Sequence, residues 1–444
     1  MPATDGIVSG MECTETIVRQ IFAAALEAAD PARAVGNHLN SLRARYRNGG
    51  FSRLLVIGFG KASVSMAQAL EHSAGDIITD GAVITKYGHG IGSKLKRIRV
   101  FEAGHPVPDE NGLNAGEELL RVAGKADAET LAAVLISGGG SALFVSPCPG
   151  ISLEEKQQTT DLLLKAGAKI HELNTVRKHI SRVKGGRLSG LLHPAASVSL
   201  ILSDVIGDSL DVIASGPTAP DPSTFAAALA VVQNYGLRRI APQAVVDHLA
   251  RGAEGLLPET PKVGDPVFSK VTNRIIGSNR MALDAARSSA EALGLRAGIL
   301  SAELSGEASE AGKILARKAL EVKRGKRDEG PFCLISGGET TVTVTGPGTG
   351  GRNMELALAF AMETEGISGI TLLSAGTDGT DGPTDAAGAV VDGMTVARAR
   401  SRGLDPVKYL HDNDSYNFFR KAGALVVTGP TGTNVMDIQI MVIE

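Results

Sequence analysis

Aromatic side chains are scarce in this chain of 444 residues, which has no tryptophan, 5 tyrosines and 11 phenylalanines. A protein that stacks single-stranded bases on aromatic platforms is therefore not expected. The charges are nearly balanced, because 45 Lys and Arg residues face 48 Asp and Glu residues and give a net charge of -3. Nucleic-acid-binding domains usually carry a basic excess, so this balance also argues against a nucleic-acid partner.

Cysteines and long apolar runs are also rare. Cys13, Cys148 and Cys333 lie far apart and form no C-x-x-C pair, which disfavours a disulfide framework or a zinc site built on cysteine. No apolar run approaches the roughly 18 residues of a membrane span. Residues 1–30 carry several acids and lack the basic cluster and apolar core of a signal peptide. We therefore expect a cytoplasmic protein with no membrane partner.

Glycine is plentiful by contrast, with 54 residues, about one in eight against a usual share of ~7%. Short apolar runs end in glycine-rich turns, and helix-like stretches follow, as at residues 54–61, 132–141 and 332–339. Apolar strands that alternate with helices are typical of parallel sheets covered on both faces. The pattern therefore predicts an α/β fold.

The pattern is interrupted once, at residues 251–266, which hold three glycines and three prolines and show no apolar periodicity. We interpret this segment as a linker between an N-terminal domain, residues 1–250, and a C-terminal domain, residues 267–444. Residues 135–139 and 334–338 share the sequence Leu-Ile-Ser-Gly-Gly, one copy in each half. We expect a Rossmann-like, mainly parallel sheet in the first domain and a mixed sheet in the second. The similar loops of the two domains would then face one active-site cleft.

The glycine turns are the first candidates for a binding site, since ligands of open α/β sheets bind at the carboxyl ends of the strands. Exposed backbone N–H groups in such turns can hold phosphate. Any single loop could equally be a plain turn between a strand and a helix. The residues expected to bind nucleotide or phosphate through these turns are Gly58, Gly60, Ser137, Gly138, Gly139, Gly140, Ser141, Gly337 and Gly338.

Two basic residues directly follow glycine turns. Lys61 stands at a predicted helix start, where its charge opposes the helix dipole, and this favours a catalytic lysine over a solvated one. Arg352 follows Gly351 and could hold a carboxylate or a phosphate with two parallel hydrogen bonds, although a solvent-exposed arginine is the alternative.

A further lysine belongs to a predicted helical hairpin. Ser152 and Glu155 have the spacing of a capping box at the start of its first helix. Residues 175–184 would form the second helix and would place Arg177 and Lys184 on one stripe. We expect Lys184 to bind phosphate.

Carboxylates and one histidine complete the candidates. Asp378, in a Gly- and Thr-rich loop with Asp381, and Glu339 offer the hard oxygen ligands that Mg²⁺ prefers. Asp-Gly sequences also form ordinary turns, so each assignment has a structural alternative. Asp204 follows an apolar strand and could act as a base or bind metal, and we include it among the catalytic residues. His105 lies in a glycine- and proline-containing loop where it could contact the substrate or be a satisfied loop histidine.

Residues 346–351 match the dinucleotide pattern G-x-G-x-x-G between a strand and a helix. The match is weak, because a proline stands inside the loop and no acid closes a strand about 20 residues further on. A nicotinamide cofactor is therefore the less favoured ligand.

Several longer segments resemble the glycerate 2-kinase family, also called the MOFRL family, and together they cover nearly the whole chain. They are residues 58–63, 102–109, 137–141, 174–187, 203–217, 350–355, 377–388 and 428–437. The resemblance implies two α/β domains around a deep cleft and ATP-dependent phosphorylation of D-glycerate with a divalent metal. It also implies that Lys61 and Arg352 are active-site residues.

We therefore predict a kinase that converts D-glycerate and ATP to 2-phosphoglycerate and ADP, with Mg²⁺ or another divalent cation. In this prediction Lys61, Arg352 and Asp204 are catalytic, His105 and Arg352 bind the substrate, and Asp378 and Glu339 bind the metal. Members of the family are also called hydroxypyruvate reductases, so an NAD(P)H-dependent reductase is the alternative. A metabolite sensor without catalysis is a third possibility. We expect a monomer or a homodimer.

Overall fold

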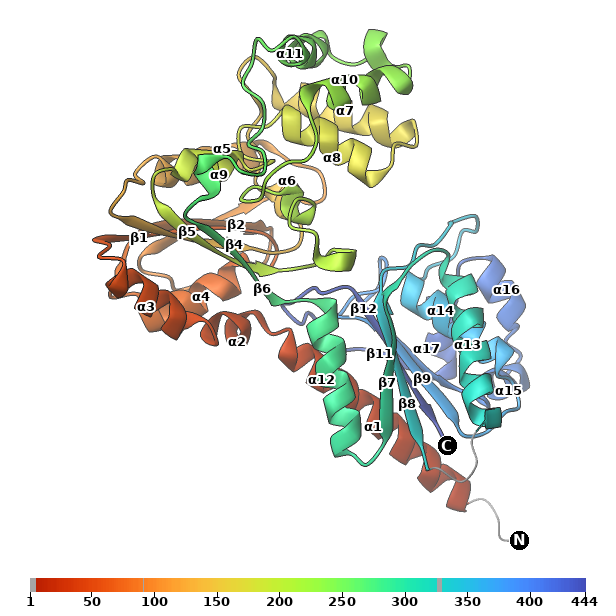
Figure 1. The fold of residues 1–444 in the computed structure, drawn as a ribbon. Helices are drawn as coiled ribbons and strands as arrows, with labels where there is room; N and C mark the ends of the chain where they lie inside the picture. The colour runs from red at the N-terminus through yellow and green to blue at the C-terminus, as the bar shows by residue number, and fades with distance from the viewer. Residues whose placement is uncertain (1–4, 91, 326–329) are drawn as a thin grey trace. The chain divides into compact units, whose positions relative to one another are not determined.

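The computed structural model describes residues 5–90, 92–325 and 330–444. The chain divides into two compact units. The N-terminal unit is Pro31–Ile276, and the C-terminal unit combines Met1–Asp30 with Gly277–Glu444. Each unit contains one six-stranded sheet with helices on both faces, which confirms the predicted α/β class (Figure 1).

The unit boundaries differ from the predicted domains 1–250 and 267–444. The predicted linker, residues 251–266, lies inside the N-terminal unit. There the Phe225 N–H donates to Glu259 Oε2 at 2.9 Å, and Thr260 Oγ1 donates to Asp221 Oδ2 at 3.0 Å. These hydrogen bonds hold the segment against the helices despite its prolines and glycines.

The first helix, α1 (Asp5–Ala28), belongs to the C-terminal unit because of its apolar face. Val18, Ile21 and Phe22 pack in one core with Leu283 of α12 (Asn279–Ala292). More than 250 residues separate the two helices along the chain, so local sequence patterns carry no trace of the contact.

The sheet of the N-terminal unit has the strand order β3-β2-β1-β4-β5-β6. The pairs β3–β2, β2–β1, β1–β4 and β4–β5 are parallel, as the buried apolar runs predict. The strands are β1 (Arg53–Phe59), β2 (Ile78–Lys86), β3 (Ile98–Ala103), β4 (Thr130–Ile136), β5 (Ala196–Leu202) and β6 (Val271–Gly277).

Helices cover both faces of this sheet, and a separate helical group extends from it (Figure 1). One face is covered by α2 (Pro31–Gly36), α3 (Leu39–Asn48) and α4 (Ser63–Ala74), and the other by α5 (Glu110–Ala123) and α9 (Arg187–Leu192). The short helix α6 (Gly140–Leu143) follows β4. The helical group consists of α7 (Leu153–Lys165), α8 (Ile170–His179), α10 (Phe225–Asn234) and α11 (Gln243–Ala253).

The helical hairpin is confirmed in part. The Ser152–Glu155 capping box is present at the start of α7. The second helix, α8, ends at His179, so Lys184 lies in the segment after it and not on a helical stripe with Arg177. Two consecutive glycines with positive φ, Gly185 and Gly186, then lead into α9.

The C-terminal unit contains a mixed sheet, as predicted, with the order β11-β10-β9-β12-β8-β7. Only the β7–β8 pair is parallel among the described pairs of this sheet, and the others are antiparallel. The strands are β7 (Arg296–Leu304), β8 (Phe332–Gly338), β9 (Ile370–Gly376), β10 (Gly388–Asp392), β11 (Leu425–Val426) and β12 (Asp437–Ile443).

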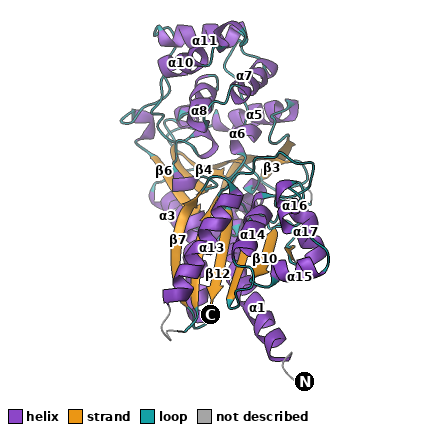
Figure 2. Ribbon diagram, turned by 90° about the vertical axis from the view of Figure 1, so that its right-hand side faces the viewer, coloured by secondary structure: helices purple, strands orange, loops and turns teal. Residues whose placement is uncertain are grey.

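Two apolar cores lie on opposite faces of this sheet. One holds α1 and α12. The other holds α13 (Ala308–Gly325) and α14 (Arg352–Glu363), which Figure 2 shows in front of the strands. The same core includes residues of α15 (Thr395–Ser401) and α17 (Ser415–Ala422), and α16 (Pro406–His411) packs beside them. None of the described helices is long and apolar enough to cross a bilayer.

The carboxyl ends of β1 and β4 are joined by backbone hydrogen bonds. Ser137 N–H donates to Phe59 O at 3.1 Å, and Lys61 N–H donates to Gly138 O at 2.9 Å. Gly60, between these contacts, has φ +123, and a Cβ there would lie 2.4 Å from the carbonyl oxygen of Ser137. Only glycine allows the two chain segments to approach so closely.

We predict that Gly60→Ala destabilises the N-terminal unit more than Gly88→Ala does. Gly88 also has a positive φ, +82, but a Cβ there would meet no atom within 4 Å. The control therefore suffers only the backbone strain, about 1–2 kcal/mol, whereas Gly60→Ala also forces β1 and β4 apart. Thermal unfolding followed by circular dichroism measures the difference. Equal midpoints for the two variants would contradict the steric argument.

Candidate functional site

The strand order of the N-terminal unit changes direction between β1 and β4, since β2 and β3 lie on one side and β5 and β6 on the other. Open α/β sheets bind ligands outside the carboxyl ends of the strands at such a point. The two glycine turns at this point are residues 58–61, at the end of β1, and residues 137–141, which follow β4. We call residues 137–141 the cradle loop.

Three predicted side chains lie directly against the cradle loop. A Cβ on Gly138 would lie 2.4 Å from Asp204 Oδ2, which follows β5. A Cβ on Gly139 would lie 2.9 Å from the His105 ring and 3.4 Å from Lys61 Cγ. Glycine at both positions thus leaves room for these three side chains, and Gly139 also needs its left-handed φ of +80. The structure therefore brings Lys61, His105 and Asp204 together, as the sequence predicts.

The cradle loop retains backbone donors. Ser137 and Gly140 N–H groups donate to Phe59 O and Ser137 O, respectively. The hydrogen bonds formed among the described residues leave the N–H groups of Gly138, Gly139 and Ser141 without an acceptor. Backbone N–H groups in a tight turn are a concave site for an anion.

His105 is half-buried beside three other basic side chains. Burial, followed by the charges of Lys61, Lys86 and His89, lowers the pKa of His105 to about 4. At neutral pH the imidazole is therefore uncharged and can donate one hydrogen bond and accept another. The positive surroundings favour a negatively charged ligand at this position.

Lys184 forms hydrogen bonds with Ser141, the last residue of the cradle loop. Its Nζ donates to the carbonyl oxygen of Ser141 at 2.8 Å and to Ser141 Oγ at 3.1 Å. Ser141 Oγ also lies 2.7 Å from Ser215 Oγ. Ala214 and Ser215 both have positive φ, 50 and 64, a strained conformation that is often found at functional sites.

The C-terminal unit places Arg352 in a different environment from the one predicted. Arg352 Nε donates to Asp437 Oδ2 at 2.6 Å, and Nη2 donates to Asp437 Oδ1 at 2.9 Å. Nη1 donates to Glu339 Oε1. Burial opposes the charged state, but the hydrogen bonds and charge of Asp437 raise the pKa of Arg352. The guanidinium therefore forms a bidentate pair with the Asp437 carboxylate of the protein.

Asp437 and Asp381 are important acids that the sequence analysis missed or left unassigned. Asp437 begins β12 and is 1% exposed, and burial raises its pKa. Asp381 accepts hydrogen bonds from the N–H groups of Asn353 at 3.1 Å and Met354 at 2.8 Å, so it caps α14. Burial raises the pKa of Asp381 to about 7. An acid in the apolar strand of residues 437–443 is the signal that could have identified Asp437.

In the loop with the dinucleotide pattern, residues 346–351, three backbone N–H groups donate to acceptors elsewhere in the protein. The N–H groups of Gly346, Gly348 and Thr349 donate to residues 412–414, at 2.9 Å in each case. Asp381 occupies the start of the following helix. A Cβ on Gly348 would lie 2.4 Å from the Asp414 side chain, so glycine serves close packing here. The loop is therefore not built to hold a pyrophosphate.

Gly337 and Gly338 differ from the matching glycines of the cradle loop. They lie within β8, where both are buried. A Cβ on Gly337 would meet the Asn279 side chain at 2.2 Å, and one on Gly338 would meet the Leu304 backbone at 2.2 Å. Packing inside the sheet accounts for both glycines, without a phosphate.

The two predicted metal ligands have protein partners. Glu339 is paired with Arg352, and Asp378 Oδ1 accepts hydrogen bonds from the N–H and hydroxyl of Thr380, both at 3.1 Å. Asp378 therefore forms an Asx turn. Among the described residues, no three His, Cys, Asp or Glu side chains are arranged to hold a metal ion.

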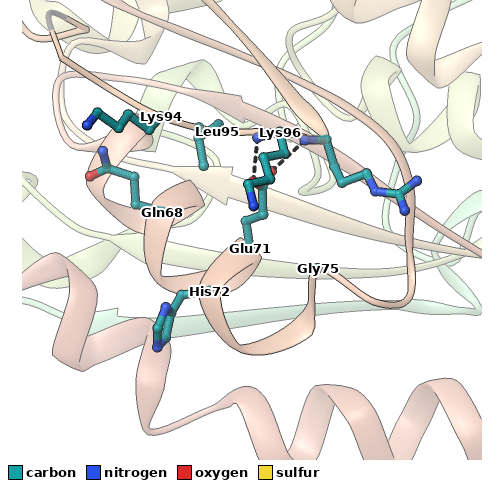
Figure 3. A pocket seen from close by; sticks show the side chains of 8 residues that line it. Gln68, Glu71, His72, Gly75, Lys94, Leu95 and Lys96 are labelled. Atoms are coloured by element: carbon teal, nitrogen blue, oxygen red, sulfur yellow. Dashed lines mark hydrogen bonds between the residues drawn. The ribbon is translucent and has the colours of Figure 1, made fainter.

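Two pockets help to locate possible ligands. One, of about 560 Å³, lies in the C-terminal unit beside Arg352 and is also lined by Asp378 and Asp381. The other, of about 570 Å³, lies in the N-terminal unit between the end of α4 and the segment before β3 (Figure 3). The Glu71 carboxylate in this pocket accepts hydrogen bonds from the backbone N–H groups of Lys96 and Arg97. This pocket adjoins the amino end of β3, whereas the cradle loop follows the carboxyl end of β4. The two therefore lie at opposite ends of the parallel strands.

We predict that Arg352→Met destabilises the protein far more than Glu339→Gln. Removing Arg352 leaves the Asp437 carboxyl buried without its partner, which typically costs about 3–5 kcal/mol. The Glu339 side chain is 45% exposed, and an exposed pair contributes at most about 1 kcal/mol. Thermal unfolding at pH 8 compares the variants, and Asp437→Asn added to Arg352→Met should restore part of the loss. No recovery in the double variant would show that the buried charge is not the cause.

We predict that His105 stays neutral down to about pH 4, since its pKa is lowered to about 4. Between this value and the ordinary pKa of 6.5, the unfolded chain binds a proton that the folded chain does not bind. Stability from this group is therefore present above pH 6.5 and is lost as the pH falls towards 4. NMR titration of the imidazole nitrogens measures the pKa directly. His105→Asn should reduce the loss of stability at acid pH, whereas His171→Asn, at an exposed position, serves as the control. A His105 pKa above 6 would refute the assignment.

Comparison with known proteins supports one family throughout the chain. Residues 17–250 match a domain family described only as a domain of unknown function, and residues 332–437 match the MOFRL family. A D-glycerate 2-kinase of Thermotoga maritima is 46% identical over 430 residues, which cover 97% of this chain and 98% of that protein. A relative from Agrobacterium vitis, named as a hydroxypyruvate reductase, is 42% identical and covers 96% of this chain and 94% of its own.

A solved structure agrees with these matches. The crystal structure of a glycerate kinase from Thermotoga maritima superposes with a TM-score of 0.89 at 45% identity, and it covers 98% of this chain and 100% of its own. Identity at this level over nearly the full length of both proteins establishes common descent and a common fold. The chain therefore belongs to the glycerate 2-kinase family, whose C-terminal part is the MOFRL family.

Proposed function

We propose that this protein transfers the γ-phosphoryl group of ATP to the 2-hydroxyl of D-glycerate and so forms 2-phosphoglycerate and ADP. The family relationship supports the reaction class. The observation that carries the assignment to a site is the cradle loop, in which Gly138, Gly139 and Ser141 offer uncommitted N–H groups beside Lys61.

Phosphoryl transfer depends on positioning and on the stabilisation of charge more than on covalent chemistry. The N–H groups of the cradle loop would hold phosphate oxygens. Gly60 allows Lys61 to reach the same loop, whereas Gly58 lies within β1 and allows close packing against Val83 and Leu135. Lys61 would then stabilise the charge that develops on the transferred group, and Lys184 would add positive charge from beneath Ser141.

We assign the acceptor substrate to Asp204 and His105, which both lie against the cradle loop. Asp204 lies against Gly138, so its carboxylate can orient the 2-hydroxyl of glycerate and accept its proton. The neutral His105 lies against Gly139 and can donate a hydrogen bond to the substrate. We assign Asp204 to the hydroxyl and His105 to substrate binding.

Arg352 has a restricted role in this proposal. A guanidinium has five N–H donors, and Asp437 and Glu339 take up three of them. Two donors are left for an oxygen of glycerate or phosphate, so Arg352 would bind substrate while it holds the neighbouring acids in place.

A magnesium ion fits the chemistry of the C-terminal unit. Four carboxylates, those of Glu339, Asp378, Asp381 and Asp437, surround the single guanidinium of Arg352 or line the adjoining pocket. Mg²⁺ commonly takes one or two carboxylates together with substrate phosphates. Asp378 and Glu339 would hold it, and a bound ion would supply positive charge for phosphate oxygens.

The reductase alternative depends on a nicotinamide site. The loop with the dinucleotide pattern binds residues 412–414 through its own N–H groups, and Asp381 caps the helix that would face a pyrophosphate. No observation therefore favours hydride transfer over phosphoryl transfer, although some relatives bear the reductase name.

We further propose that the protein acts in the cytoplasm on small molecules alone, as a monomer or a homodimer. Cys148 and Cys333 are both free thiols and both buried, as is usual in proteins of reducing compartments.

We predict that the purified protein with ATP, Mg²⁺ and D-glycerate forms 2-phosphoglycerate and not 3-phosphoglycerate. Lys61→Met should lower kcat by about 10²–10³ while ATP still binds, since a charge that acts in the transition state affects kcat. Lys94→Met is the matched control, because Lys94 is exposed and lines the pocket at the opposite edge of the same sheet. Product analysis by NMR and calorimetry of ATP binding provide the readouts. NADH-dependent reduction of hydroxypyruvate without phosphorylation would overturn the proposal.

A further inference from the structure

Three cationic side chains from three different segments interact with one another, and two of them contact the cradle loop. Lys156 comes from α7, Arg177 from α8, and Lys184 from the segment after α8. We call these three residues the cation cluster. Lys184 donates to the carbonyl oxygen of Ser141, and Arg177 Nη2 lies 3.5 Å from the same oxygen.

The cluster is buried without a counterion. Lys156 is 2% exposed and Lys184 is 1% exposed. Within the part of the chain that the structure describes, neither lysine nor Arg177 forms an ion pair with a carboxylate, and Lys156 Nζ has no hydrogen-bond partner. By contrast the neighbouring buried Lys178 is paired with Asp211 and Asp221. An uncompensated buried charge is costly, and proteins normally provide it with a partner.

Among the described residues, the titratable groups that shift the pKa values of these amines are the members of the cluster itself and Cys148. Burial and then Arg177 lower the pKa of Lys156 to about 7, while Cys148 acts weakly in the other direction. Burial raises the pKa of the Cys148 thiol, so this thiol supplies no negative charge at neutral pH. Burial, followed by Arg177 and Lys156, holds the pKa of Lys184 well below its ordinary value. Lys156 also stands within the first four residues of α7, where the helix dipole disfavours a cation.

The cluster adjoins the proposed phosphate site. Ser141 joins the two, because its N–H is one of the uncommitted donors of the cradle loop while its carbonyl oxygen and hydroxyl contact Lys184. Ser141 and Arg177 are only partly buried, so the cluster is not closed off from solvent on this side.

We propose that Lys156, Arg177 and Lys184 form an anion subsite that binds a phosphate group of the ligand held by the cradle loop. The anion supplies the negative charge that the cluster lacks, and the amines take up protons when it binds. The chemistry fits either the polyphosphate of the nucleotide or the phosphate of the phosphorylated product. The inference rests on the proposed function only for the source of this phosphate.

Calorimetry at pH 8 in buffers of different ionisation enthalpy tests the subsite without turnover. The probes are inorganic tripolyphosphate, a non-hydrolysable ATP analogue and 2-phosphoglycerate, each titrated into the full chain. We expect binding to be accompanied by proton uptake, because Lys156 is largely uncharged at pH 8 and becomes charged beside the anion. Uptake with the first two probes assigns the subsite to the nucleotide, and uptake with 2-phosphoglycerate assigns it to the product.

Lys156→Met is the decisive variant, since methionine replaces an amine without a hydrogen bond by an apolar group of similar length. We expect the dissociation constant of the probe to rise by about tenfold to a hundredfold, as for loss of a charged hydrogen bond, and proton uptake to fall. The thermal midpoint of the unliganded protein should stay the same or rise. Lys165→Met, at an exposed position on the same helix, should change none of these quantities.

Arg177→Gln is the second variant, because Arg177 is only partly buried and its loss should weaken binding even if Lys156→Met does not fold. Unchanged affinity and unchanged proton uptake in both variants would overturn the subsite. A protein that binds tripolyphosphate with proton uptake but makes no 2-phosphoglycerate would retain the subsite and disprove the kinase. A protein that makes 2-phosphoglycerate but takes up no protons when any of the probes binds would retain the kinase and disprove the subsite.

Discussion

The close approach of the β1 and β4 carboxyl ends is the constraint on which the N-terminal unit depends. Gly60 and the backbone of Ser137 are in contact, and Lys61 N–H donates to Gly138 O. This contact fixes the cradle loop relative to Lys61. It also directs the loop's unused donors to the end of the sheet where the strand order reverses. A larger residue at Gly60 would separate Lys61 from the N–H donors of the cradle loop. The arrangement of the proposed site therefore depends on the same close backbone contact that joins β1 to β4.

The two units differ in whether their glycine loops and charged side chains have partners within the protein. Among the described residues of the N-terminal unit, three N–H donors of the cradle loop have no acceptor, and the three residues of the cation cluster have no carboxylate partner. In the C-terminal unit, Arg352 is paired with Asp437, and Asp381 caps α14. A site that is electrostatically satisfied stabilises its fold, whereas one with unsatisfied donors and cations is suited to an anionic ligand. This contrast supports the proposal that the phosphate groups bind to the N-terminal unit.

Local features of the sequence predicted local features of the structure well. The alternation of strands with helices and the capping box at Ser152 follow from residues close together along the chain. The shared Leu-Ile-Ser-Gly-Gly sequence was misleading, however. After β4 the two glycines leave the sheet and form a turn, whereas β8 continues through Gly338 because β12 pairs with it there.

Partners that are distant along the chain could not be predicted. Asp437 is 85 residues from Arg352, and α1 packs against α12, which lies far from it along the chain. A single sequence contains no signal for such pairs. The cation cluster was missed for a related reason, since Lys156 has the appearance of an ordinary surface residue in a capped helix until its burial is known.

Hydrogen exchange followed by mass spectrometry, with a non-hydrolysable ATP analogue and D-glycerate, tests most directly where the phosphates bind. The unused N–H groups of the cradle loop should acquire acceptors, so peptides that contain residues 137–141 should become protected. Peptides that contain residues 346–351 should change little, because three of the N–H groups in that loop already have acceptors. Protection of residues 346–351 with no change at residues 137–141 would contradict the assignment of the phosphate site to the N-terminal unit.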